Sequence, residues 1–248
     1  MEGYGAETYG DRWAEVYDEV HEEPADAGAT TAAVGVLAGL ARGGRVLELG
    51  VGTGRLALPL AERGLEVHGI DASAQMLELL RAKPGGDRVT ASLGDLADVD
   101  VDGEFDLIFV AFNTLFALTS QEEQIRCFDN VARRMTADGM FVVEAFVPDL
   151  ARFDRGQTVR ASRVETDEIA LEVTRHDRAT QTLKSQHVVI TEAATRLLPV
   201  HIRYSWPSEL DLMARLAGLH LQDRWSGWDR SPFTSASGEH VSVYTRPS

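Results

Sequence analysis

The chain has 248 residues, 44% of them hydrophobic and 25% charged, which is enough apolar material for one large domain or for one domain with a sizeable insertion. The 39 acidic residues outnumber the 24 lysines and arginines to give a net charge of −15, which repels a phosphate backbone and argues against a nucleic-acid partner. The sequence shows neither the apolar run of a membrane helix nor a signal peptide at its start, so we expect a cytoplasmic protein without a membrane partner.

The first part of the chain, residues 1–150, alternates helix-length segments with short apolar runs. A helix is predicted over residues 8–20, with Tyr9, Trp13, Val16, Tyr17 and Val20 on one face. Strands are predicted over residues 45–49, 65–70, 88–93, 105–112 and 140–146, and helices over residues 56–63, 73–83 and 121–135. Such alternation predicts βαβ units with right-handed crossovers, and therefore an α/β fold with a parallel sheet.

After residue 150 the pattern changes. Four extended stretches with period-two alternation cover residues 158–164, 169–177, 182–191 and 195–205. This spacing predicts an antiparallel β insert over residues 151–206, after the fifth strand, which we expect to form a substrate lid. Residues 207–248 then supply a last helix, from Pro207 to Gly218, and two closing strands over residues 219–225 and 239–245.

A glycine-rich turn follows the first strand, with the pattern Glu48-x-Gly50-x-Gly52-x-Gly54. Glycines permit a sharp turn and let a ligand touch the backbone, whereas a turn without a ligand does not require three of them. Gly52-x-Gly54-x-x-Ala57 also fits the loose dinucleotide pattern, in which a pyrophosphate sits at the helix N-terminus. The carboxylate of Glu48 would repel phosphate and attract an ammonium or sulfonium, which favours a cationic ligand over NAD.

The same residues resemble the first motif of the class I S-adenosylmethionine-dependent methyltransferases, and further matches follow in order up to residue 146. The resemblance implies a Rossmann-like sheet of seven strands, with the closing pair providing the family's antiparallel strand. It also implies that Asp71 receives both ribose hydroxyls and that Asp95 accepts from the adenine amino group. Each residue has an alternative role, since Asp71 can cap a helix, Asp95 can be a turn residue and Met76 can be plain core. Their combination at successive strand ends favours the ligand site.

The cofactor implied is S-adenosyl-L-methionine. The residues that the resemblance assigns to it are Tyr9, Trp13, Tyr17, Glu48, Gly50, Gly52, Gly54, Asp71, Ala72, Met76, Gly94, Asp95, Leu96 and Phe112.

The layout resembles one branch of the family, small-molecule methyltransferases of secondary metabolism such as sugar-amine N-methyltransferases. That branch has an antiparallel insert after the fifth strand and an aromatic N-terminal helix over the cofactor, which Tyr9, Trp13 and Tyr17 match in type. Ordinary core packing is the alternative role for these three rings. The branch's histidine after the fourth strand has no counterpart in residues 113–118, where this chain departs from the pattern.

The expected reaction is in-line displacement of a methyl group onto a nitrogen, oxygen or carbon atom of a small molecule. Such a reaction needs alignment of the reactants and exclusion of water, with histidine as the usual base where one is required. His187 and His201 are the candidate bases, with structural hydrogen bonding as their alternative role. The candidate substrate contacts are Asn113, Phe116, Arg175, Arg203, Tyr204, Trp206 and Trp228.

Two other functions stay open on the sequence alone: a dinucleotide-dependent reductase and a non-catalytic protein that retains a nucleoside pocket. No metal site is expected, because Cys127 is the only cysteine and the seven histidines lack metal-binding spacing. The sequence allows either a monomer or a homodimer.

Overall fold

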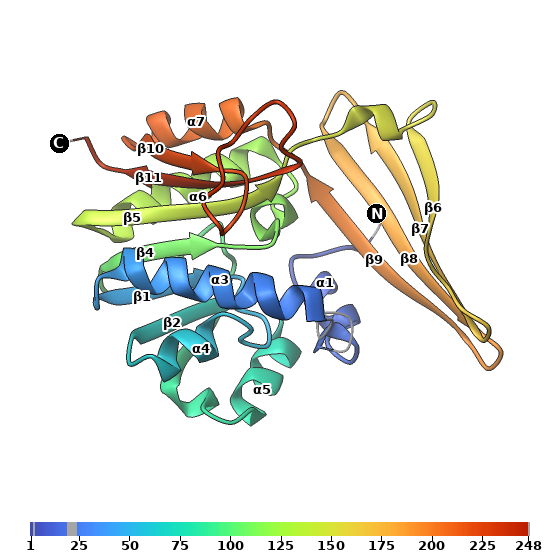
Figure 1. The fold of residues 1–248 in the computed structure, drawn as a ribbon, viewed down its shortest axis with the longest axis horizontal. Coiled ribbons are helices and arrows are strands. Elements are labelled where there is room, and N and C mark those ends of the chain that lie inside the picture. Colours follow the sequence, from blue (N-terminus) through green and yellow to red (C-terminus); the bar gives the residue numbers. More distant parts are fainter. Residues whose placement is uncertain (2, 19–23, 248) are drawn as a thin grey trace.

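The computed structural model describes residues 1, 3–18 and 24–247, with the backbone alone for residues 24–27. A seven-stranded sheet forms its centre, in the order β10-β11-β5-β4-β1-β2-β3 (Figure 1). Its strands are β1 (Arg45–Leu49), β2 (Glu66–Asp71), β3 (Val89–Leu93), β4 (Phe105–Val110), β5 (Met135–Phe146), β10 (His220–Trp225) and β11 (Glu239–Thr245). The first five strands pair in parallel, while β11 is antiparallel to both β5 and β10. The predicted α/β fold with a seven-stranded sheet is confirmed.

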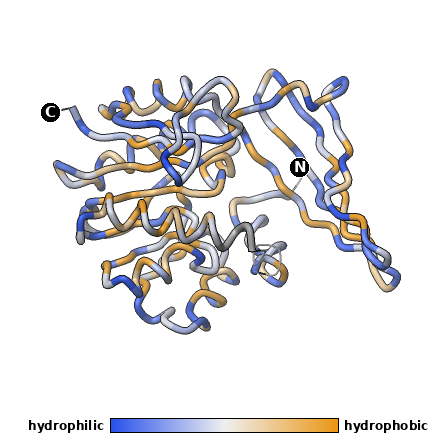
Figure 2. Tube along the Cα trace, viewed as in Figure 1, coloured by the Kyte–Doolittle hydropathy of each residue, from blue (hydrophilic) through white to orange (hydrophobic). Residues whose placement is uncertain are grey.

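Helices cover both faces of this sheet, so the core has two apolar layers. The helices α3 (Pro24–Ala41), α4 (Ala57–Glu62) and α5 (Ala74–Ala82) share one layer with the sheet, and α6 (Gln121–Arg134) and α7 (Pro207–Leu216) share the other. Because both faces are covered, the central strand β4 has almost no polar face, and Figure 2 shows hydrophobic residues concentrated along the central strands.

Local signals explain where several helices begin. Ser120 accepts from the backbone of Glu123, and the Glu123 side chain accepts from the backbone of Ser120, which makes a capping box at the start of α6. Ser73 caps α5, and Pro207 occupies the first turn of α7. Among the helices of the described part, none is both long and apolar enough to span a membrane.

A separate four-stranded antiparallel sheet follows β5 and projects from the carboxyl end of the central strands (Figure 1). Its strands, in the order β6-β7-β8-β9, are β6 (Gln157–Val164), β7 (Glu168–Asp177), β8 (Thr182–Thr191) and β9 (Thr195–Arg203). The predicted antiparallel insert is therefore confirmed, while the exact division at residues 150 and 206 stays a prediction. The short helix α1 (Thr8–Trp13) lies between this sheet and the core.

The structure differs from the sequence prediction in three places. The helix α3 was not predicted, because its alanine-rich sequence has no apolar stripe that marks a helix. The predicted helix over residues 8–20 is interrupted, since α1 ends at Trp13, residues 14–16 form a turn and residues 17–18 are helical again, and Val20 lies outside the described residues. The strand β5 begins at Met135 instead of residue 140, directly after α6 ends at Arg134.

Candidate functional site

The glycine turn after β1 is built around the carboxylate of Asp71. Gly50, Gly52 and Gly54 have φ values of 74°, 53° and 88°, a left-handed region that glycine reaches without strain. The Asp71 carboxylate accepts from the backbone N–H groups of Gly52, at 2.8 Å, and Ser73, at 2.9 Å. Burial raises the pKa of Asp71, although these N–H bonds oppose the shift. Asp71 therefore joins the turns that follow β1 and β2.

Glu48, the last buried polar residue of β1, has an unsatisfied carboxylate oxygen. The residue is 5% exposed, and its Oε2 has no hydrogen-bond partner among the described residues. Burial raises the pKa of Glu48 to about 8, with Asp71 adding to the shift and Arg55 and the Ala57 backbone opposing it. A buried acceptor left open beside a glycine turn fits a cationic ligand group.

A short N-terminal cover lies against the start of α5. The Ser73 hydroxyl donates to Asp11 Oδ1 at 2.6 Å, which fastens α1 beside Asp71. Tyr9 stacks on Trp13, with ring centroids 5.4 Å apart, and contacts Tyr17 edge-on. Burial raises the pKa of Tyr17 to about 12, and the nearby carboxylates of the glycine turn add to this shift. The predicted aromatic cover thus lies beside the turn.

Met76 and the Gly94-Asp95-Leu96 segment complete the predicted adenosyl side. Met76 is 2% exposed and packs with Trp13 beneath the N-terminal cover, which is the plain-core arrangement, so its contact with adenine stays a prediction. Ala72 is half-buried beside Asp71. The three residues of the Gly94 segment are half-buried after β3, and Asp95 Oδ1 accepts from the backbone of Ala97 at 2.8 Å.

The end of β4 has two consecutive non-glycine residues in the left-handed region, Phe112 at φ 55° and Asn113 at φ 66°. Such conformations persist where neighbours fix them, and they concentrate at functional sites. Glu144 fixes this turn, because its carboxylate accepts from the Phe112 backbone at 2.7 Å and from Trp228 Nε1 at 2.6 Å. Asn113 Oδ1 in turn accepts from the Phe146 backbone at 2.7 Å.

Sequence reasoning missed Glu144 and Arg55. Glu144 interrupts the apolar run of a buried strand, a signal that could have marked it. The guanidinium of Arg55 lies 5.0 Å from the Phe112 ring, donates to Thr30 Oγ1 at 2.9 Å and attracts both Glu48 and Glu144. Arg55, a cation near the buried Glu48 and the half-buried Glu144, gives this end of the site both signs of charge.

The two candidate bases lie on opposite faces of the insert. His187 pairs with Leu198 across β8 and β9, and its ring is 5.1 Å from Trp13, so it faces the N-terminal cover. His201 pairs with Lys184 across the same two strands. Lys184 lies three residues from His187 on β8, so the two side chains are on opposite faces of the sheet, and His201 shares the face of Lys184. Burial lowers the pKa of both histidines. Only His187 faces the core.

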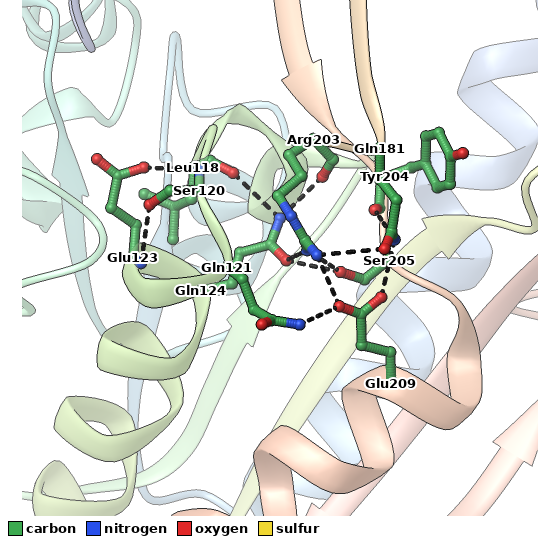
Figure 3. Close-up of polar contacts among 10 residues, drawn as sticks. All are labelled: Leu118, Ser120, Gln121, Glu123, Gln124, Gln181, Arg203, Tyr204, Ser205 and Glu209. Atoms are coloured by element: carbon green, nitrogen blue, oxygen red, sulfur yellow. Dashed lines mark hydrogen bonds and ion pairs between the residues drawn. The ribbon is translucent and has the colours of Figure 1, made fainter. Parts of the chain in front are cut away.

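Arg203 belongs to a buried polar network that joins the insert to the core (Figure 3). Its guanidinium pairs with Glu209 of α7 at 2.7 Å and donates to Gln124 of α6 at 2.8 Å. Hydrogen bonds from Arg203, Gln181 and Gln121 lower the pKa of Glu209 although burial opposes the shift. The predicted substrate contact of Arg203 stays a prediction, since the described contacts are structural.

The other predicted substrate residues divide between the two sides of the insert. Phe116 is buried with its ring 5.0 Å from Phe146, at the end of β5. Tyr204 is buried, and Trp206, which is 38% exposed, contacts it edge-on. Arg175 pairs with Lys184, which places it on the outer face with His201. Arg175 and His201 therefore point away from the end of β4.

Comparison with known proteins gives concordant matches. A family described as a methyltransferase domain matches residues 46–139. Cypemycin N-terminal methyltransferase from Streptomyces sp is 32% identical over 209 residues, which are 82% of this chain and 84% of that protein. The solved structure of the CcbJ methyltransferase from Streptomyces caelestis is 42% identical, covers 99% of this chain and 100% of its own, and has a TM-score of 0.91. The amino pentose methyltransferase CalS10 from Micromonospora echinaspora, solved with S-adenosylmethionine bound, shares the fold at 21% identity, with coverage of 94% and 96% and a TM-score of 0.68.

Proposed function

We propose that this chain, which belongs to the class I S-adenosylmethionine-dependent methyltransferases, methylates an amine nitrogen of a small molecule in secondary metabolism. Membership of that family makes the chain a methyltransferase with S-adenosylmethionine as cofactor, and it decides against the dinucleotide-dependent reductase and the non-catalytic nucleoside-binding protein. The choice of a nitrogen acceptor, the small-molecule substrate and the cytoplasmic location remain proposals. So do the absence of a nucleic-acid partner and the choice between monomer and homodimer.

The residues at the glycine turn fit the cofactor. Glu48 offers a buried, unpartnered carboxylate oxygen for an ammonium group. A Cβ built on Gly52 would meet nothing within 4 Å, so the turn leaves open space for a ligand against its backbone. Asp71 and Asp95 would accept from the ribose hydroxyls and the adenine amino group. When bound, S-adenosylmethionine supplies an activated methyl group on a sulfonium.

The surroundings of the acceptor carry the proposal of an amine. Aromatic residues lie at the ends of β4 and β5, where Phe116 contacts Phe146 edge-on and Glu144 accepts from the backbone N–H of Phe112. Methylation of an amine leaves a cationic ammonium, whereas methylation of an alcohol leaves a neutral ether. Aromatic faces and a nearby carboxylate stabilise a cation, so this surrounding favours the nitrogen acceptor. Two of the relatives are named for amine-bearing groups, the N-terminus of cypemycin and an amino pentose.

His187 is suited to a modest proton-transfer role. Its ordinary pKa is close to 6.5, and burial lowers this pKa further while Glu172 opposes the shift. The ring is therefore neutral at pH 7 and able to accept a proton. A neutral imidazole can accept the proton that an amine nitrogen loses once it has been methylated.

Transfer of a labelled methyl group tests the proposal. The protein would be incubated with S-adenosylmethionine carrying a deuterated methyl group and with matched amine and alcohol pairs, including amino sugars and short peptides with free N-termini. We expect S-adenosylhomocysteine to accumulate with amines, with the label on nitrogen in tandem mass spectra. Asp71→Ala serves as the cofactor-site control and should abolish turnover at limiting cofactor. Label on the oxygen of an alcohol, with the matched amine unchanged, would refute the nitrogen acceptor.

A further inference from the structure

A cavity of about 210 Å³ lies between the end of β5 and the inner face of the insert. Its walls are mainly apolar and aromatic, with one cation, Arg152, and one anion, Asp149, among them. The lining residues that matter here are Phe146, Leu150, Arg152, Phe153, Leu183 and Tyr204. A concave apolar pocket with few polar groups is the usual form of a small-molecule site.

Arg152 lines this cavity with one donor unused. Its terminal nitrogen pairs with Glu172 Oε1 at 3.1 Å, and its guanidinium lies 5.0 Å from the Phe153 ring, so its orientation is fixed. Thr174 donates to the same Glu172 oxygen at 3.1 Å and holds that carboxylate in place. The Nε of Arg152 is buried without a partner among the described residues. A buried N–H left without an acceptor is costly unless a ligand supplies one.

The aromatic wall opposite is also held rigidly. Tyr204 is 2% exposed, and its hydroxyl lies 2.9 Å from Nε2 of the buried His176. The His176 ring packs on Phe153, with centroids 4.7 Å apart. These contacts fix both rings, so the cavity is preformed and needs little reorganisation to receive a ligand.

Phe146 connects the wall of the cavity to the end of β4, where the acceptor atom is proposed to react. Phe146 lines the cavity, its backbone N–H donates to Asn113 Oδ1, and its ring contacts Phe116. A molecule whose amine lies among these aromatic residues can therefore extend a second arm into the cavity.

We infer that the cavity binds a non-reacting arm of the acceptor, an apolar or aromatic group carrying a carbonyl or carboxylate oxygen that accepts from Arg152 Nε. That the bound molecule is the methyl acceptor rests on the proposed function. The binding of an oxygen-bearing apolar group in the cavity does not. It narrows the substrate class to amines with an oxygen-bearing apolar arm, and it assigns Arg152 as a specificity-determining residue.

Binding of small probes tests this assignment without any methyl transfer. Phenylacetate, phenylacetamide and toluene would be titrated onto the full chain saturated with S-adenosylhomocysteine, with binding followed by saturation-transfer NMR. We expect the two oxygen-bearing probes to bind the wild-type chain. Arg152→Gln should weaken them at least tenfold and leave toluene unchanged, while Leu183→Trp should exclude all three probes. Arg155→Gln, an exposed arginine three residues away, is the matched control and should change nothing.

Each variant would first be checked for S-adenosylhomocysteine binding, which reports a folded cofactor site. Should Arg152→Gln fail to fold, Arg152→Lys carries the same expectation, because lysine keeps the charge but has no N–H at the Nε position. Failure of phenylacetate to bind the wild-type chain, or equal binding to the arginine variant, would overturn the assignment. Methyl transfer to alcohols alone would refute the nitrogen acceptor of the proposed function and would not change these binding results.

Discussion

Glu48 is a buried carboxyl group whose protonation depends on what lies beside its open oxygen. Its pKa of about 8 in the free protein, raised by burial, means that it holds a proton at pH 7. An ammonium group placed at Oε2 favours the ionised form and lowers that pKa. Cofactor binding at pH 7 should therefore release a proton, and affinity should increase with pH up to about 8 and then level off.

Calorimetric titration of S-adenosylhomocysteine in buffers of different ionisation enthalpy measures this proton release. We expect the wild-type chain to release up to one proton more per molecule bound at pH 7 than Glu48→Gln does. The release measured for Glu48→Gln reports the protons exchanged by the ligand and is subtracted. The raised pKa of Glu48 also affects stability. Between about pH 4.5 and about pH 8 the folded chain keeps a proton on Glu48 that the unfolded chain has lost, so the free energy of unfolding falls as pH rises through this range. Equal proton release by wild type and variant would contradict the role of Glu48.

The adenosyl-site residues Glu48, Asp71 and the glycines could be predicted from short local patterns. Glu48 lies near the end of β1, Asp71 ends β2, and the glycines follow β1, so the strand ends and the turn chemistry that place them are local. Glu144 and Arg152 have no such motif, because their roles come from contacts with residues distant in the chain. Their positions depend on the packing of the insert against the core, which sequence patterns do not encode.

At the level of elements, strands were easier to predict than the helix α3. Buried strands of a doubly covered sheet stand out as apolar runs, as in β4. The helix α3 has alanine and glycine on most sides, so no 3.6-residue period marks it. The order of the strands was not predicted, because pairing partners far apart in sequence leave no local signal; the family resemblance implied only a seven-stranded sheet with an antiparallel closing strand.

Close packing of α1 on α5 makes Gly10 a sensitive position. A Cβ built on Gly10 would lie 2.3 Å from Ser73 Cβ and 3.2 Å from Met76 Cγ, so any side chain must displace α1. Gly10→Ala should weaken S-adenosylhomocysteine binding about tenfold, or ~1.4 kcal/mol, because Tyr9 and Tyr17 move away from the glycine turn. Gly35→Ala on α3 is the control, since its Cβ meets nothing within 4 Å. Calorimetry that gives both variants wild-type affinity would contradict this role of α1.

The Arg203–Glu209 pair is the charged centre of the junction between insert and core (Figure 3). Glu209→Gln leaves the Arg203 guanidinium buried without its counter-charge, which should lower the free energy of unfolding by roughly 3 kcal/mol. The double variant Arg203→Met with Glu209→Leu should lose less, because no buried charge remains. Urea denaturation measures all three proteins.

The exposed Arg126–Asp98 pair offers a matched control for that comparison. Its side chains are 47% and 57% exposed, so Arg126→Gln should lower the free energy of unfolding by less than about 1 kcal/mol.

The contribution of Glu209 to stability depends on pH in a definite direction. Because the pKa of Glu209 is lowered in the folded chain, its contribution is present above the ordinary glutamate pKa and is lost as pH falls below it. A double variant less stable than Glu209→Gln would contradict this account.

At the scale of the whole molecule, the charge of −15 acts on any ligand that approaches the site. A field of one sign raises the local concentration of oppositely charged ligands and speeds their association. An amine acceptor is mainly cationic at neutral pH, so the acidic chain attracts it before it loses its proton. A neutral acceptor is not attracted by this field, so its association is not accelerated.

Ionic strength separates these cases, because the Debye length falls from about 20 Å near 20 mM salt to below about 10 Å near 300 mM. For a cationic amine accepted in the methyl-transfer assay, kcat/KM should fall several-fold over that range. For an acceptor of the same panel that is uncharged at the assay pH, kcat/KM should change little, and the S-adenosylhomocysteine affinity measured alongside controls for salt effects on the cofactor site. Parallel salt dependences for the two acceptors would show that the net charge of the chain has no part in choosing its substrate.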